Sequence, residues 1–302
     1  MAVHEASQPY QPPIAHPLRA MGTHTFDLDR QVAVVAIIDC TPDSPSEAGR
    51  TVGLDVAVRA SIDAVAAGAD WVDLGGASVA AGEDTAAHEA ERVVAIVREL
   101  RAASDVVIAV DASDAGVASA AIDAGADVIR VGGAQGPDLI GAIAASDATL
   151  VLAHSLDAEV DASTAEAAVE DDVVALLEAR VAQALDGGVR ADRILLDPGL
   201  DLDGHAIDSL RLARRLSTVA DLGFPVLATM SSAPLLGAAA DASSSERGDR
   251  ALAATVFAIT RGARIVRTHD AARTQVVVRA TEALMGWRAP ADPIRDLSAF
   301  DV

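Results

Sequence analysis

Short runs of Val, Ile and Leu alternate with longer, Ala-rich amphipathic stretches along the chain, and the alternation occurs eight times after residue 30. A short apolar run is typical of a buried strand, and a longer stretch with helical periodicity is typical of a helix that covers it. The predicted strands are 32–38, 70–74, 106–110, 127–131, 149–153, 193–197, 225–229 and 264–267. The predicted helices are about 54–67, 86–103, 114–124, 137–146, 164–187, 207–221, 246–261 and 270–285.

Strands that alternate with helices predict βαβ units and therefore a parallel sheet. Eight such units without a Gly-rich nucleotide fingerprint favour closure into a single-domain TIM (β/α)₈ barrel. The barrel is predicted over 31–288, after an irregular, partly disordered arm over 1–30 and before a tail over 289–302. The sequence Gly-Ala-Asp recurs at 68–70 and 125–127, where its glycine is expected to end a helix in the left-handed conformation.

Composition limits the partners and the compartment. Hydrophobic residues make up 51% of the 302 residues and aromatic residues only 2%, so the core must consist of Ala, Val, Leu and Ile. The net charge is −22, and all 23 bases are Arg. An acidic surface repels nucleic acid and anionic membrane, so neither is an expected partner. Cys40 is the single cysteine, which excludes an intrachain disulfide, and it is expected to be a buried thiol. The absence of a long apolar run predicts a cytoplasmic protein.

Charged side chains follow several of the predicted strands. The active site of a (β/α)₈ barrel lies at the C-terminal ends of its strands, so these side chains are candidate site residues. Asp111 and Asp197 each end an apolar strand, where a carboxylate is costly unless it accepts hydrogen bonds. Paired carboxylates suit a planar heterocycle with ring N–H and amino donors. The alternative for a single such Asp is a helix N-cap or a turn at the strand end.

Six segments of the sequence resemble dihydropteroate synthase, in that family's order and spacing, over roughly residues 30–285. They are Thr41-Pro42-Asp43-Ser44, Asp73-Leu74-Gly75-Gly76, Val110-Asp111, Asp197-Pro198-Gly199, Glu246-Arg247 and Arg264-Ile265-Val266-Arg267-Thr268-His269-Asp270. Each segment alone is a weak signal, and six in register are a strong one. The resemblance implies an enzyme of folate biosynthesis that joins a pterin, supplied as its pyrophosphate ester, to p-aminobenzoate.

The resemblance also implies roles for individual residues. Asp111 and Asp197 would hold the pterin nitrogens, and Arg267 with His269 would face the pyrophosphate, whose departure positive donors stabilise. Asp39 stands where the family usually has a metal-binding Asn, and an Asp there still suits Mg²⁺. His154 is expected to form a wall of the pocket. The candidate substrate-binding residues are Asp73, Arg130, His154 and Ser231. The family resemblance further implies a homodimer formed through the late helices.

The chain departs from the family at positions that carry chemistry. The fourth strand of the family usually ends in Asn-Asp, and here it reads Arg130-Val131. An Arg has no acceptor and cannot reproduce both hydrogen-bonding functions of an amide. The family's Ser-Arg-Lys after the seventh strand is replaced by residues 231–233 (Ser-Ser-Ala), and no Lys exists elsewhere. The second loop, at 78–81, lacks the family's Arg.

Three functional interpretations remain open. The retained acids and bases favour an active pterin-transferring enzyme with an altered site. The missing Lys and Asn favour a non-catalytic paralogue that keeps a pterin- or phosphate-binding pocket and acts as a partner subunit. A pterin-binding barrel of the methyltransferase type shares the acid pair but needs a corrinoid partner. For Arg267, the alternative to anion binding is a structural ion pair with Asp270 or Asp39.

Overall fold

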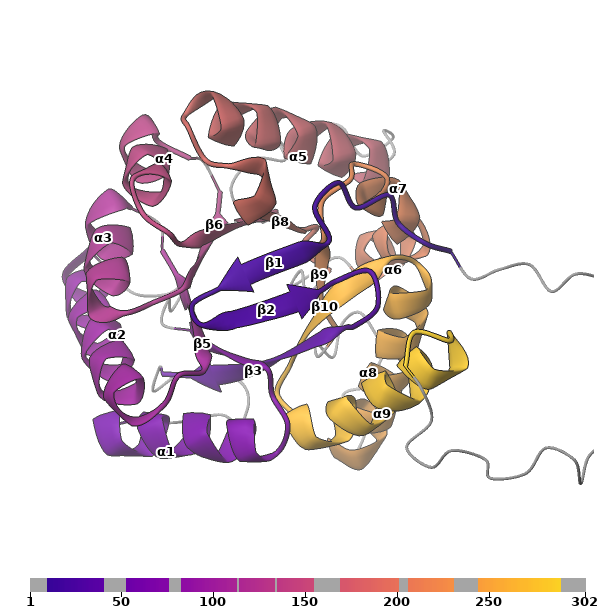
Figure 1. The fold of residues 1–302 in the computed structure, drawn as a ribbon, viewed down its shortest axis with the longest axis horizontal. Coiled ribbons are helices and arrows are strands. Elements are labelled where there is room, and N and C mark those ends of the chain that lie inside the picture. The colour runs from indigo at the N-terminus through magenta and orange to yellow at the C-terminus, as the bar shows by residue number, and fades with distance from the viewer. Residues whose placement is uncertain are drawn as a thin grey trace, which may run out of the picture.

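Eight parallel strands close into a barrel in the order β10-β3-β4-β5-β6-β7-β8-β9, and helices surround it (Figure 1). The computed structural model describes residues 10–40, 53–75, 83–112, 114–133, 135–154, 169–200, 206–230 and 244–288. The barrel strands are β3 (Ala33–Asp39), β4 (Trp71–Gly75), β5 (Val107–Asp111), β6 (Val128–Gly132), β7 (Thr149–Ala153), β8 (Ile194–Asp197), β9 (Val226–Thr229) and β10 (Ala263–Thr268). The predicted TIM barrel and its eight strands are therefore confirmed.

The helices lie outside the barrel, where they bury the outer faces of the strands (Figure 1). They are α1 (Leu54–Ala66), α2 (Glu83–Ala103), α3 (Ala115–Ala124), α4 (Pro137–Ala144), α5 (Val169–Asp186), α6 (Ala206–Arg214), α7 (Leu216–Ala220), α8 (Ser244–Thr260) and α9 (Ala271–Leu284). The prediction of one helix over 207–221 is wrong, because the segment forms α6 and α7 with Arg215 between them. Among the described residues, no helix combines the length and the hydrophobicity needed to cross a bilayer.

An antiparallel hairpin of β1 (Leu18–Met21) and β2 (His24–Asp27) crosses the N-terminal end of the barrel (Figure 1). The prediction of an irregular arm over 1–30 is therefore wrong for this segment. Arg19 Nη1 donates to the carbonyl oxygen of Ala191 at 3.0 Å, just before β8. His24 Nε2 lies 3.0 Å from the carbonyl oxygen of Asp105, just before β5. These contacts attach the hairpin to the loops at the closed end of the barrel.

The lumen beneath the hairpin is apolar. Trp71 of β4 is fully buried there, and its ring meets the Phe26 ring of β2 edge-on, with the centroids 6.0 Å apart. Further lumen residues of this cluster are Ala33, Val35, Val107, Ala109, Val128, Val151, Leu195, Leu227 and Ile265. Side chains two residues apart on a strand share a face, so the residue two positions beyond each of these also points inward. On five strands that position is charged: Asp73, Asp111, Arg130, Asp197 and Arg267.

The Gly-Ala-Asp repeat has a structural function. Gly68 and Gly125 have φ values of 105° and 112°, which confirms the left-handed conformation predicted for them. Asp70 and Asp127 then accept a hydrogen bond from a backbone N–H of the preceding barrel strand, at 2.8 and 2.9 Å respectively. Each repeat thus ends a helix and fastens the beginning of the next strand to its neighbour. Cys40 is buried after β3, as expected for a structural thiol.

Both ends of the described chain contact the beginning of β10 at Arg264. Burial of this side chain lowers its pKa to about 10. Its Nη2 donates to Gln11 Oε1 at 3.2 Å, and its guanidinium carbon lies 4.2 Å from the centroid of the Trp287 ring. The neighbouring Gly262 (φ 106°) leaves room for the Tyr10 ring, which a Cβ would approach to 2.8 Å. The N-terminal and C-terminal segments are therefore fastened to one strand.

Candidate functional site

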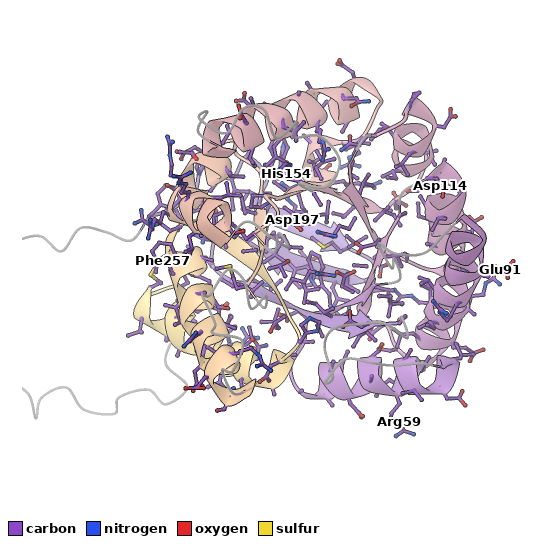
Figure 2. The ribbon with its side chains drawn as sticks, turned by 180° about the vertical axis from the view of Figure 1, so that it is seen from behind. Arg59, Glu91, Asp114, His154, Asp197 and Phe257 are labelled. Carbon is purple, nitrogen blue, oxygen red and sulfur yellow. The ribbon has the colours of Figure 1, made fainter. Side chains whose placement is uncertain are left out.

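The charged ends of the strands form one cluster at the C-terminal mouth of the barrel. Figure 2 views this end, with Asp197 near the centre of the ring and His154 beside it. Five strands contribute to the cluster, and every contributing side chain lies on the lumen face. The members are Asp73 (β4), Asp111 (β5), Arg130 (β6), Asp197 (β8) and Arg267 (β10). The structure thus brings together residues that the sequence scatters over nearly two hundred positions.

Arg130 joins the two acids that were predicted to hold a ligand. Its Nη1 lies 3.2 Å from Asp111 Oδ1, and its Nη2 lies 2.8 Å from Asp197 Oδ2. Its Nε also donates to Asp197 Oδ2, at 3.0 Å. Asp111 and Arg130 are neighbours in the register of β5 and β6, whereas Asp197 lies two strands further around the barrel. Arg130 therefore points into the mouth and spans it.

Asp197 is more enclosed than Asp111, with its side chain 1% exposed. Its Oδ1 accepts a hydrogen bond from the backbone N–H of Gly199 at 2.9 Å, while its Oδ2 accepts from Arg130. Its backbone oxygen accepts from the N–H of His154 at 2.8 Å. Both carboxylate oxygens thus have partners within the protein, as buried charge requires.

Arg267 forms an ion pair with Asp73 through its Nε atom, and both side chains are nearly buried, at 11% and 2% exposed. The partner is therefore Asp73, and not Asp270 or Asp39, the acids of the alternative structural ion pair. Arg267 points into the lumen toward β4, while Asp270 caps α9 by accepting from the N–H of Arg273 at 3.1 Å. Within the described residues, Arg267 Nη1 and Nη2 have no hydrogen-bond partner.

Asp73 carries an unusual carboxylate. Its Oδ1 is buried and lacks a hydrogen-bond partner in the described part of the chain. Burial raises the pKa of Asp73, and the Arg267 guanidinium opposes this change. The Asp73 carboxylate nevertheless fixes the Nε edge of Arg267, which leaves the opposite edge of the guanidinium for a ligand.

His269 and Asp39 lie together at the rim, with 3.8 Å between His269 Nδ1 and Asp39 Oδ2. Burial lowers the pKa of His269 below its usual value, although Asp39 opposes this effect, so the ring is mostly neutral at pH 7. A neutral imidazole contributes hydrogen bonds at this position but no fixed charge. The predicted binding of a metal ion by Asp39 remains a prediction.

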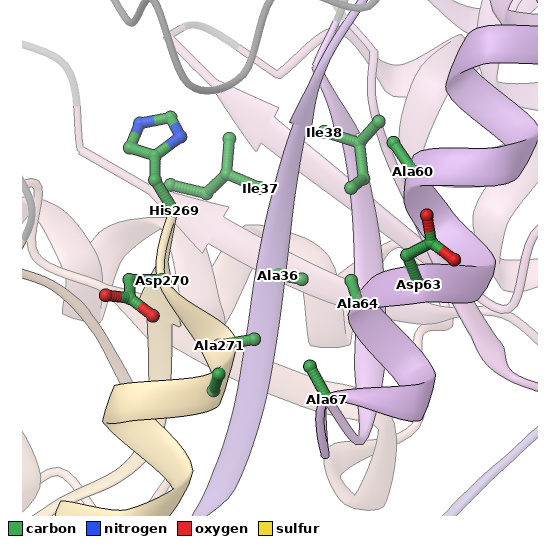
Figure 3. A pocket seen from close by; sticks show the side chains of 11 residues that line it. Ala36, Ile37, Ile38, Ala60, Asp63, Ala64, Ala67, His269, Asp270 and Ala271 are labelled. Carbon is green, nitrogen blue, oxygen red and sulfur yellow. The ribbon is translucent and has the colours of Figure 1, made fainter.

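A cavity of about 280 Å³ opens beside His269, between α1, β3 and the beginning of α9. Figure 3 shows His269 and Asp270 on one side of it, and Ala60, Asp63 and Ala64 of α1 on the other. Neither Asp111 nor Asp197 lines this cavity. It is therefore separate from the acid cluster.

Two further predicted site residues are His154 and Ser231. His154 is buried at the end of β7, beside Asp197. Its function as a wall of the pocket remains a prediction. The described residues contain no group of three or more His, Cys, Asp or Glu that could hold a metal. Ser231 lies outside the described residues.

Arg180 of α5 supports the site but was not among the residues predicted from the sequence. This buried arginine donates from Nη1 to the carbonyl oxygen of Ala153, at 2.6 Å, and so supports the end of β7 next to His154. A signal existed in the sequence, because Arg180 follows the buried Leu177 at helical spacing and so shares its inward face.

We expect a crystal grown in sulfate or phosphate to hold an anion within hydrogen-bond distance of Arg267 Nη1 and Nη2. Asp73 binds only the Nε edge of this guanidinium, and the first N–H groups of α9 add a favourable dipole nearby. The anion should disappear in Arg267→Gln crystals grown in the same solution. Wild-type crystals without an anion at high sulfate would show that the pair with Asp73 exhausts this side chain.

Comparison with known proteins finds relatives along most of the chain. The family model described as "Pterin binding enzyme" matches residues 35–269. The dihydropteroate synthase of Streptococcus pyogenes is 32% identical over 86% of this chain and 98% of its own. A Mycobacterium leprae protein named "Inactive dihydropteroate synthase 2" is 34% identical over 89% of this chain and 96% of its own. The structure of Xanthomonas albilineans dihydropteroate synthase with 4-aminobenzoic acid has a TM-score of 0.79 and 28% identity, over 92% of this chain and all of that one. This chain therefore belongs to the dihydropteroate synthase family of pterin-binding enzymes.

Proposed function

We propose that this protein binds a pterin pyrophosphate at the mouth of the barrel and transfers the pterin to p-aminobenzoate, at a low rate. The observation that carries the proposal is that Asp111 and Asp197 both accept hydrogen bonds from one guanidinium. The 2-amino group and adjacent ring N–H of a pterin form the same N–C–N fork of donors. Two carboxylates that accept hydrogen bonds from one guanidinium are therefore spaced to accept them from this edge of a pterin.

The reaction that the family implies gives the other residues of the mouth their proposed roles. The carbon–oxygen bond to pyrophosphate breaks, and its electron pair leaves with the pyrophosphate. The amine nitrogen of p-aminobenzoate then forms a bond to the pterin methylene carbon and loses a proton. Arg267 Nη1 and Nη2 would donate to the departing oxygens, with His269 adding a neutral hydrogen bond at the rim. Enclosure of the pterin by Asp111 and Asp197 would fix the methylene group near the amine.

A divalent cation fits the charge balance of this mouth. The four acids described above outnumber the two arginines, so pyrophosphate alone would meet an excess of negative charge. Mg²⁺ is commonly held by one or two carboxylates together with substrate phosphates, and Asp39 can supply one such ligand. When bound, Mg²⁺ would neutralise charge on the leaving group.

Replacing Asp197 by Ala is expected to weaken pterin binding by about 2–4 kcal/mol, because a charge-assisted hydrogen bond in a buried site is lost. Isothermal titration calorimetry with a pterin or its pyrophosphate ester measures this change. Asp192→Ala is a suitable control, because Asp192 pairs with Arg190 just before β8, at the closed end of the barrel. Equal pterin affinity in Asp197→Ala and wild type would remove this acid from the site.

A second candidate function, a non-catalytic pterin- or phosphate-binding subunit, is favoured by one observation. Arg130 already occupies both acids, at a position where the family usually has Asn. The similarity to the mycobacterial protein named inactive agrees with this candidate. Complementation of a strain that lacks its own synthase separates the two. Growth without folate end-products supports the transferase, whereas pterin binding without growth supports the binding subunit.

The assembly and the compartment are part of the same proposal. We expect a cytoplasmic homodimer formed through the late helices, on which Phe257 of α8 and Val276 and Leu284 of α9 are exposed apolar side chains. Sedimentation equilibrium tests the dimer. A monomer at micromolar concentration would contradict it.

A further inference from the structure

Arg130 fills the space between Asp111 and Asp197. We propose that the guanidinium of Arg130 is an internal competitor for the pterin. Arg130 must be displaced before a ligand reaches the two acids, and it thereby sets the affinity of the site. The proposal rests on the proposed function in one respect, namely that these two acids are the ligands of the pterin ring.

Arg130 uses Nη1 for Asp111 and both Nε and Nη2 for Asp197, so the guanidinium lies between the two carboxylates. The remaining oxygen of Asp197 accepts from the N–H of Gly199 at 2.9 Å. With its side chain 1% exposed, Asp197 presents almost no carboxylate surface to a ligand while Arg130 is in place. Arginine and pterin are therefore alternative occupants.

A guanidinium and the 2-aminopyrimidinone edge of a pterin are both planar and both present donors on two nitrogens bonded to one carbon. Carboxylates recognise such a fork through paired hydrogen bonds. Arg130 therefore satisfies Asp111 and Asp197 in the way that a pterin would, and a pterin gains little by entering unless its other contacts compensate.

Burial on its own lowers the pKa of Arg130, but the carboxylates of Asp111, Asp197 and Asp73 raise it well above its ordinary value. Arg130 thus stays protonated throughout the physiological range. The competitor cannot be switched off by deprotonation, so only movement of the side chain opens the site.

The structure also indicates how Arg130 could leave. The side chains of Arg130 and Asp111 are 21% and 25% exposed, so this half of the ion-pair cluster borders solvent. A single contact of 3.2 Å joins Arg130 to Asp111, whereas two contacts join it to Asp197. Displacement should therefore begin at the Asp111 side.

The expected effect on binding follows from the population of the open state. A ligand that binds only when Arg130 is displaced has an apparent dissociation constant equal to its intrinsic value divided by the open fraction. If roughly one molecule in a hundred is open, pterin affinity falls about a hundredfold. Arg130→Asn removes the competitor and supplies an amide with both donor and acceptor, so pterin should bind at least about tenfold more tightly.

The experiment titrates pterin into the full-length wild type and three variants, with pterin fluorescence as the readout. Arg130→Asn and Arg130→Ala remove the competitor. Arg130→Lys keeps a cation but loses the fork of donors. It tests the same displacement if the neutral variants fold poorly. We expect all three to bind pterin more tightly than wild type, with the largest gain in Arg130→Asn. Arg101→Ala is the matched control, because Arg101 forms a similarly half-buried pair with Asp127 at the closed end of the barrel.

Methylguanidinium provides a second measurement. It should bind Arg130→Ala and compete there with pterin, whereas in wild type the place is already taken. Wild type and variants with equal pterin affinity would overturn the internal competitor and leave the proposed function intact. Folded variants and wild type that all fail to bind pterin would overturn both, since the acids would then not form a pterin site.

Discussion

The double variant Arg130→Asn with Ala233→Lys is expected to convert pterin pyrophosphate and p-aminobenzoate about 100- to 1,000-fold faster than wild type in the presence of Mg²⁺. Restoring one positioned charged donor to a reacting site is worth about 2.7–4 kcal/mol, which corresponds to this range. The Asn substitution frees the acids, and the Lys substitution restores the family's residue at position 233, which lies outside the described residues. Wild type itself should turn over slowly or not detectably.

Initial rates of pyrophosphate release measure this prediction, with each single variant as a control. Arg130→Asn alone should improve pterin binding more than it improves the maximal rate. Ala233→Lys alone should change little, because Arg130 would still hold both acids. Wild-type turnover as fast as that of an ordinary synthase would show that the replaced residues are dispensable in this chain.

Trp71→Ala is expected to lower the free energy of unfolding by about 3–5 kcal/mol, the usual cost of removing a large buried aromatic side chain. Trp71 is fully buried in the lumen and contacts Phe26 of the hairpin. The surrounding side chains are held by strand pairing on both sides, so the barrel cannot collapse to fill the cavity. The loss should therefore lie toward the upper part of this range.

Urea denaturation followed by far-UV circular dichroism measures the effect of Trp71→Ala. Leu185→Ala is the control, since Leu185 is 41% exposed on α5 and should contribute much less. A Trp71→Ala protein that is as stable as the control would show that the hairpin moves into the vacated space.

Much of the fold was predictable because parallel barrel strands are buried on both faces and therefore form continuous apolar runs. The hairpin was not predicted, for a physical reason. Each of its strands has only four residues, and the buried ones among them, such as Met21 and Phe26, are too few to show a period. Contacts with the closed end of the barrel stabilise it, and such contacts leave no local pattern in the sequence.

The candidate site was predictable in its members more than in its pairings. Strand-end acids can be identified from sequence, because their position relative to the apolar run determines the face on which they lie. Partner choice depends on distances across the lumen. Arg130 and Asp197 are 67 positions apart, and Arg267 and Asp73 are 194 apart. The alternative ion pair of Arg267 with Asp270 or Asp39 named the wrong acids, because Arg267 points across the lumen to Asp73 on β4, one strand beyond the neighbouring β3.

Segments near both ends of the described chain contact Arg264, so these two segments lie close together in space. Gln11 and Trp287 contact one side chain, so a short peptide could join the two segments without disturbing any strand pairing. New termini could then be opened in a surface loop such as Gly187-Gly188, between α5 and β8. Proteins whose ends lie close together tolerate such circular permutation. The new termini would lie at the closed end of the barrel, so a fused protein would leave the mouth with Asp111 and Asp197 open to substrates.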